Sequence, residues 1–249
     1  MASFRLLSAM VLFTACSFGQ TALPVGTVLP VRIDTALDSN KATVGQVISG
    51  TVIQDVPLAS GTKLSAGTHV TGRVTEVDKS NTTSKLAFTF DRIHASSGEL
   101  SILTSARAIA SSVDVRSAML PMTREDRPEW QWTTVQVGGD VVYGIADRVE
   151  SAGKFVGRPV KGGVLVQVSA VPGSECSGKN GQAQALWVFS SSACGVYGFE
   201  EGLTIAPAGH SNPLRSIVLE SPRRIQVEKG SGILLSIVSE SQSVAEGSL

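Results

Sequence analysis

The feature that most constrains the fold of this chain is the alternation of residue types over short segments. In KLAFTFDRI, Leu86, Phe88 and Phe90 fall on one face, opposite the residues between them. The segment GTVLPVRIDT shows the same alternation from Leu29 to Ile33. A period of two is that of a β-strand, because successive side chains of a strand point to opposite faces of a sheet. These segments therefore predict strands.

Further segments of this kind follow along the chain, each bounded by Gly, Ser, Asn or Asp: VGQVISGTVIQDV, THVTGRVTEV, ELSILTSARAI, GGVLVQVS, ALWVFS, LTIAPAG, RSIVLES, RRIQV and GILLSIV. Their spacing of about a dozen residues favours a barrel or a sandwich over alternating strands and helices. The predicted fold is all-β, a barrel or sandwich of about ten or more short strands with an irregular central insertion.

The predicted strands group into one β-barrel domain that is interrupted by the insertion. We expect residues 23–110 and 212–239 to form the barrel, and residues 111–211 to form an insertion or a second small β subdomain. Within it, DVVYGIADRVES fits either a short helix or a strand with a turn. The polar residues 240–249 are expected to form a flexible tail.

The N-terminal residues have the composition of a secretory signal. One positive charge, Arg5, precedes a short apolar run that is followed by small residues. Residues 1–19 are therefore predicted to be a signal peptide, which would leave Gln20 as the new N-terminus of a periplasmic or outer-membrane-associated protein. A second interpretation reads FTAC as a bacterial lipoprotein box, with Cys16 as the lipid attachment to the outer membrane.

Cys176 and Cys194 would be the two cysteines left after export. An even number of cysteines in an oxidising compartment predicts a disulfide, which would stabilise the fold by about 3 kcal/mol in the chain-entropy model. The alternative is that both are buried free thiols.

Charge and motifs argue against nucleic-acid or nucleotide partners. The chain has 21 basic and 21 acidic residues, so no net charge steers it to nucleic acid. The stretch PGSECSGKNG fits the spacing of a phosphate-binding loop, but Asn180 stands where a Ser or Thr would ligate magnesium. No helical pattern follows it, so the stretch is interpreted as a hairpin connection.

We expect no catalytic residue, metal site or cofactor. Asp34 lies in RIDTAL, which resembles half of an aspartic protease motif, but Ala36 replaces the required Gly and no second copy is present. His69, His94 and His210 fall in separate segments without metal-binding spacing. A hydrolase, in which a His, an Asp and a Ser converge in a cleft, is the least favoured function.

The clearest binding feature is PEWQW. Trp130 and Trp132 are two residues apart, so on a strand they would face the same side and stack on sugar rings, with Tyr143 as a third member. The alternative is that they cover one end of the barrel, because Trp is usually largely buried.

Several strand and turn segments follow one another in the order LPVGTVLPVRIDTALDSN, VISGTVIQDV, LSAGTHVTGRVTEV and FTFDRIHASSGELSIL, with VEKGSGILLSIV near the end. This order is similar to the barrel domain of the TrbI-type family, the envelope-spanning scaffold proteins of conjugation and type IV secretion machines. The resemblance covers about half of the chain without its signal, and it implies an exported β-barrel of the bacterial envelope. Members of that family carry an inner-membrane helix and apolar helices that cross the outer membrane, and this chain lacks both patterns, so a pore is not implied.

The sequence thus predicts an exported, non-enzymatic cell-envelope protein that acts as a scaffold or interaction domain. Its expected partners are envelope proteins or further copies of itself. The alternative is a module that binds cell-wall glycan or another polysaccharide through Trp130 and Trp132.

Overall fold

The structure of the chain is a computed structural model that describes residues 23–58, 61–80, 82–96, 98–119, 131–138, 141–145, 148–151, 154–160, 163–167, 183–206 and 216–243. Several features named above lie outside these residues: residues 1–20 with Cys16, Trp130, the loop PGSECSGKNG with Cys176, and His210.

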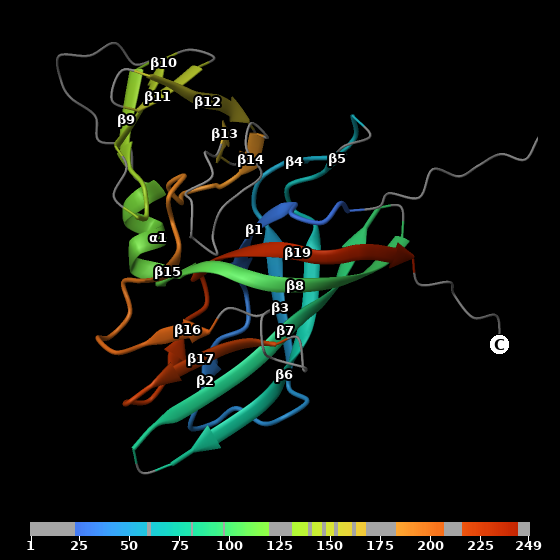
Figure 1. Ribbon diagram of the computed structural model, residues 1–249, viewed down its shortest axis with the longest axis vertical. Helices are drawn as coiled ribbons and strands as arrows, with labels where there is room; N and C mark the ends of the chain where they lie inside the picture. The colour runs from blue at the N-terminus through green and yellow to red at the C-terminus, as the bar shows by residue number, and fades with distance from the viewer. Residues whose placement is uncertain are drawn as a thin grey trace, which may run out of the picture.

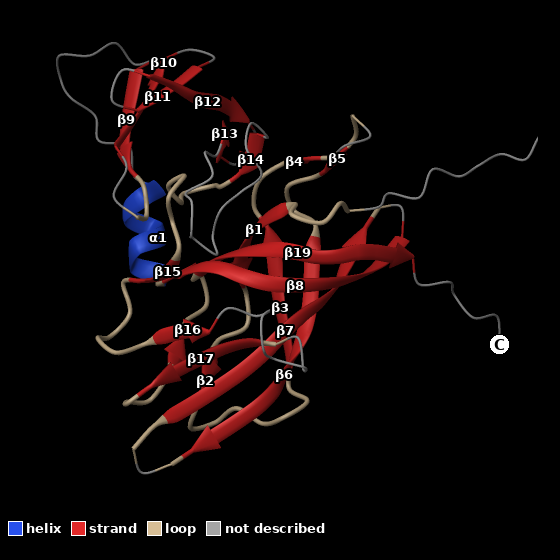
Figure 2. Cartoon of the chain, in the orientation of Figure 1, coloured by secondary structure: helices blue, strands red, loops and turns tan. Residues whose placement is uncertain are grey.

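Six antiparallel strands form a closed barrel in the order β8-β19-β1-β3-β6-β7, and β7 pairs with β8 to complete the ring. Their bounds are β1 Val28–Ile33, β3 Val47–Val52, β6 His69–Lys79, β7 Ser84–Ala95, β8 Gly98–Ala110 and β19 Gly232–Ser243. Strands dominate the molecule, and the described residues contain a single helix (Figures 1 and 2). The all-β prediction is confirmed.

Short strands extend and flank the barrel: β2 Leu37–Asp38, β4 Val56–Pro57, β5 Lys63–Leu64, β15 Gly195–Tyr197, β16 Thr204–Ala206, β17 Ile217–Ser221 and β18 Gln226–Val227. β17 pairs with the first half of β7, β16 pairs with β17, and β15 runs parallel to the end of β8. The segments around β15 and β16, which the sequence places in the insertion, therefore add strands to the barrel sheet. β19 continues through Ser243 into the predicted tail, because it pairs with β8 that far.

The second sheet is a six-stranded antiparallel meander, with strands β9 Gln131–Val135, β10 Val141–Ile145, β11 Arg148–Ser151, β12 Lys154–Val160, β13 Gly163–Gln167 and β14 Ala183–Ala185. It curves above the barrel in Figure 1, next to the helix α1, Ser112–Met119. The segment DVVYGIADRVES was expected to form either a short helix or a strand with a turn. Its described residues form two paired strands and no helix, with β10 ending at Ile145 and β11 beginning at Arg148.

The expectation of a strand over ALWVFS is wrong. β14 ends at Ala185, and Trp187 has a positive φ of 51°, so the chain turns there. Leu186, Trp187 and Phe189 are all buried. The turn brings these consecutive apolar residues into one core, which the alternating faces of a strand would not do.

The interior of the barrel is the main hydrophobic core. Leu86, Phe88 and Phe90 have no exposed surface, as predicted, and the rings of Phe88 and Phe90 meet edge to face with centroids 6.1 Å apart. Ala87 and Thr89, on the opposite face of β7, are buried as well. This part of β7 is therefore covered on both faces.

A second core joins the outer face of the barrel to the helix and the second sheet. Val28, Ala108 and Leu234 face away from the barrel interior and pack in one cluster with Val115 of α1 and Trp187. The outer face of β1, β8 and β19 is thus as apolar here as the inner one. Such a face is expected where a second layer covers it.

Two buried polar side chains connect the barrel to the region around β14. Gln54 donates from Nε2 to the carbonyl of Val164 over 2.8 Å, and its Oε1 accepts from the amide of Trp187 over 2.7 Å. Arg107 of β8 donates from Nε to the carbonyl of Ala193 over 3.0 Å, and burial lowers the pKa of its guanidinium. Buried polar groups with good partners fix the relative position of the segments they join.

Candidate functional site

Two groups of polar residues are candidates for function. One is a row of side chains on β6, β7 and the start of β8, which we call the polar row. The other is a pocket at the N-terminus of α1, which we call the α1 pocket.

The polar row is set by a β-bulge in β7. Thr71 pairs with Arg92, whereas the next residue, Gly72, pairs with Phe90, so Asp91 is an extra residue without a partner in the ladder. A bulge changes the direction in which the following side chains point. As a result Asp91 and Arg92 are both partly exposed, although they are adjacent in sequence.

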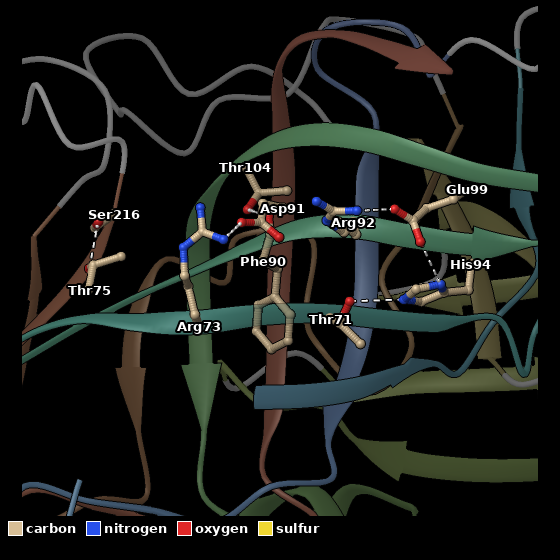
Figure 3. Close-up of polar contacts among 10 residues, drawn as sticks. All are labelled: Thr71, Arg73, Thr75, Phe90, Asp91, Arg92, His94, Glu99, Thr104 and Ser216. Atoms are coloured by element: carbon tan, nitrogen blue, oxygen red, sulfur yellow. Dashed lines mark hydrogen bonds and ion pairs between the residues drawn. The ribbon is translucent and has the colours of Figure 1, made fainter. Parts of the chain in front are cut away.

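Figure 3 shows the residues that meet at one end of the polar row. Thr71 Oγ1 lies 2.9 Å from His94 Nε2, and His94 Nδ1 lies 3.4 Å from Glu99 Oε2. Glu99 also pairs with Arg92. The order hydroxyl, imidazole, carboxylate is that of a nucleophile with its base and orienting group. The side chain of His94 is 41% exposed.

The rest of the polar row consists of paired charges and hydroxyls. Arg73 Nη1 lies 3.1 Å from Asp91 Oδ2. Lys85 Nζ lies 2.9 Å from Glu76 Oε1, and this hydrogen bond raises the pKa of Lys85. Exposed ion pairs of this kind contribute about 0–1 kcal/mol each. The row therefore shapes the surface more than it stabilises the fold.

Two histidines that the sequence places in separate segments are cross-strand neighbours, because the register of β6 and β7 pairs His69 with His94. The spacing of 25 residues carries no local signal, so only strand pairing brings them together. Within the described ranges, no group of three or more His, Cys, Asp or Glu residues is arranged to hold a metal ion.

The α1 pocket lies between the first turn of α1, the connection from β15 to β16 and the segment from β17 to β19. Its volume is about 190 Å³. These elements lie close together on one side of the barrel in Figure 1. Its lining includes Ser112, Val113, Phe199, Glu228 and Ser231.

Among the serines that line the α1 pocket, two lie at the start of α1 and one lies just before β19. Ser111 Oγ accepts from the amide of Asp114 over 3.1 Å, which caps the helix. Ser112 Oγ donates to Glu228 Oε2 over 2.7 Å. Ser231 has no exposed surface, and its Oγ has no hydrogen-bond partner among the residues that the structure describes. This helix was not predicted from the sequence, although a Ser followed three residues later by an Asp is typical of a helix start.

An ion pair lies at the edge of the α1 pocket. Arg224, one of the lining residues, donates from Nε to Asp38 Oδ1 over 2.8 Å and from Nη2 to the other oxygen. The hydrogen bond from Arg224 lowers the pKa of Asp38 to about 2. The pair connects β2 to the segment that leads into β18.

This ion pair predicts a dependence of stability on pH. The pKa of Asp38 is depressed in the folded state, so the pair stabilises the fold above about pH 4 and loses its effect as the pH falls toward 2. We expect Asp38→Asn to lower the melting temperature at pH 7 and to match the wild type near pH 2. Thermal unfolding of both proteins across this range measures the difference. Asp78→Asn, at an exposed position of β6, is the control; a similar profile for both variants would contradict the prediction.

The structure places the predicted binding residues only in part. Trp132 lies in β9 opposite Gly144, and Tyr143 lies in β10 opposite Thr133, so the two aromatic residues are not opposite each other in the ladder. Trp130 lies outside the described residues.

Cys194 is exposed and directly precedes β15, and its amide donates to Tyr197 Oη over 2.9 Å. Cys176 lies outside the described residues, so the bridge between Cys176 and Cys194 stays a prediction. Cys16, likewise, is not among the described residues.

Asp34, the residue of the half-motif RIDTAL, directly follows β1. Its Oδ2 accepts from Thr51 Oγ1 over 2.6 Å and its Oδ1 accepts from Arg32 Nε over 3.1 Å. Thr51 belongs to the neighbouring strand β3, and Arg32 belongs to β1 itself. The carboxylate therefore has a structural role in joining β1 to β3.

No protein-family model matches this chain, and no functionally characterised protein matches it significantly. Across the described part of the chain, α1 is the single helix, and it is too short to cross a bilayer. The function of the chain is therefore inferred from its sequence patterns and from the geometry of the barrel, the polar row and the α1 pocket.

Proposed function

We propose that this chain is an exported, non-enzymatic protein of the bacterial cell envelope that acts as an interaction domain. The main support for the proposal is that the sequence segments with the family resemblance are the same segments that form the barrel. The segments that resemble the TrbI-type barrel contain β1, β3 and parts of β6, β7, β8 and β19, which are the six strands of the closed barrel. The signal-like residues 1–19 support export.

The proposed contact face lies at the turn that enters β3. Val44 and Val47 are 67% and 68% exposed, and Val47 pairs with Arg73 of the polar row. An apolar centre with a charged rim is the common arrangement of a protein contact. The ion pair of Arg73 with Asp91 would form part of that rim.

Site-specific photo-crosslinking in cells tests this contact face. A photoreactive residue at Val47 is expected to give an adduct with another envelope protein, or with a second copy of the chain. The same residue at Lys229, which is exposed on the segment leading into β19, is the control. Equal adducts at both positions, or none at Val47 in a folded protein, would contradict the proposal.

Intact mass spectrometry of the protein from the envelope tests export. A chain that begins at Gln20 indicates a released protein, and a lipid adduct on Cys16 indicates an anchored one. A protein that retains residues 1–19 and fractionates with the cytoplasm would contradict export. Reduction is expected to add the mass of two hydrogens, as the bridge between Cys176 and Cys194 requires.

A hydrolase is the second candidate, because Thr71, His94 and Glu99 lie in the order of a catalytic relay. We favour the non-enzymatic function because the side chain of His94 is 41% exposed to water and Glu99 is shared with Arg92. A relay of this kind works best in a site that excludes water and holds an oxyanion.

Ester hydrolysis distinguishes the two functions. Under the non-enzymatic function neither side chain belongs to an active site, so we expect His94→Ala and Thr71→Ala to leave the slow turnover of p-nitrophenyl acetate within about twofold of the wild type. Both variants should also unfold within about 1 kcal/mol of the wild type, as exposed polar pairs do. A drop of about a hundredfold in both folded variants would instead identify a hydrolase.

A further inference from the structure

Two histidines lie opposite each other on the outer surface of the barrel. His69 of β6 and His94 of β7 are partners in the ladder and both are exposed, whereas the next pair, Val70 and Ile93, belongs to the barrel core. Directly opposite residues of antiparallel strands point to the same face, with Cβ atoms about 4.5–5.5 Å apart. Two nitrogens that bind one metal ion lie about 3 Å apart, which two imidazole rings can reach from this separation by a change of rotamer.

The contacts of His94 orient its ring toward the other histidine's strand. Glu99 Oε2 lies 3.4 Å from His94 Nδ1, and Thr71 Oγ1 of β6 lies 2.9 Å from Nε2 (Figure 3). A carboxylate beside one ring nitrogen favours a proton on that nitrogen, which leaves the other nitrogen with a lone pair for a metal ion. The exposed hydroxyl of Thr71 can turn to water when an ion takes its place.

The charges in this part of the sheet do not repel a cation. The charged side chains form ion pairs, Arg92 with Glu99 and Arg32 with Asp34. Thr51 of β3 lies opposite the histidine of β6, and its hydroxyl donates to Asp34 Oδ2 over 2.6 Å. Each of these arginines therefore has a carboxylate beside it that offsets its charge.

Two imidazole nitrogens, with water in the remaining positions, suit Cu²⁺, Ni²⁺ and Zn²⁺, whereas Mg²⁺ and Ca²⁺ prefer oxygen ligands. Of the first three ions, Cu²⁺ binds such ligands most tightly. We therefore propose that His69 and His94 together bind a divalent transition-metal ion, Cu²⁺ above all, and that Glu99 orients His94 for this role. Local spacing predicts no such site, because only strand pairing joins its two ligands. The contact face at Val44 and Val47 uses other residues, so either proposal can fail without the other.

Calorimetric titration of the full exported chain with Cu²⁺ tests the proposal. His69→Gln and His94→Gln should each weaken binding by at least about tenfold, because each leaves a single imidazole. Glu99→Gln should weaken it by about tenfold, as the loss of a carboxylate behind a metal-bound histidine does. The three side chains lie at the surface, so without metal the variants should melt close to the wild-type temperature. Mg²⁺ is the control ion and should not bind.

NMR locates the bound ion, because paramagnetic Cu²⁺ broadens the signals of nearby residues. The amides of His69, His94 and Glu99 should broaden first, and that of Leu86, roughly 25 Å back along β7, should stay sharp. His210→Gln changes the third histidine of the chain and should leave binding unchanged. The proposal is overturned if the folded wild type binds no Cu²⁺, if Mg²⁺ binds equally well, if either His69→Gln or His94→Gln keeps the wild-type affinity, or if the broadening lies away from β6 and β7. Unchanged binding by Glu99→Gln would overturn the orienting role of Glu99.

Discussion

Replacing Gly72 by alanine is expected to cost at least about 4 kcal/mol of the free energy of unfolding. A Cβ atom at this position of β6 would lie 1.7 Å from the carbonyl oxygen of Thr89 and 2.8 Å from the Cα atom of Phe90. Both are backbone atoms, so no rotamer change relieves the clash, and β6 and β7 would have to separate. Urea unfolding of wild type and Gly72→Ala measures the loss.

Gly67→Ala is the matched control for this prediction. Gly67 has a φ of +95°, but a Cβ atom there would meet nothing within 4 Å. Only backbone strain opposes the change, so we expect a loss of about 1 kcal/mol. If Gly72→Ala lost no more free energy of unfolding than Gly67→Ala, then β6 and β7 would not approach each other as closely at the bulge as the structure shows.

Arg107→Met is expected to destabilise the fold by about 3 kcal/mol. The guanidinium is buried and donates to the carbonyls of Ala193 and Ser191 and to Gln184 Oε1, over distances of 2.7–3.2 Å. Methionine fills a similar volume but leaves these acceptors without their donor. The stability of Arg107→Lys should lie between that of the wild type and that of Arg107→Met, because one ammonium cannot reach three acceptors in different directions.

Two measurements separate this effect from a general loss of charge. Arg73→Met removes an arginine from an exposed ion pair and should cost no more than about 1 kcal/mol. In Arg107→Met, hydrogen exchange should accelerate at the amides of residues 184–193 and stay unchanged in β1 and β3. Uniform acceleration across the barrel would show that Arg107 does not specifically hold this segment.

Part of the barrel could be predicted from the local order of residues along the chain. Leu86, Phe88 and Phe90 alternate with less apolar neighbours, and this pattern needs no long-range information to indicate a strand with one face in a core. Trp187 shows the limit of the same reasoning. Its apolar neighbours look like a strand, but a turn with a positive φ is favoured because it buries all of them in the second core.

The candidate sites depended much more on the tertiary structure. His69 and His94 are neighbours only because β6 pairs with β7 in one register, and the bulge at Asp91 sets which side chains join them. The α1 pocket combines the first turn of α1 with Glu228 and Ser231, which are more than a hundred residues away. Neither combination leaves a spacing that a sequence motif records.

The sequence by itself determined the strand content, the predicted export signal and the apolar faces, because these follow from the local order of side chains. The tertiary structure decided the closure of the barrel, the short helix α1 and the pocket beside it. Closure depends on β7 reaching both β6 and β8 in compatible registers, and the pocket forms only because strand pairing and packing bring residues from distant parts of the sequence beside α1.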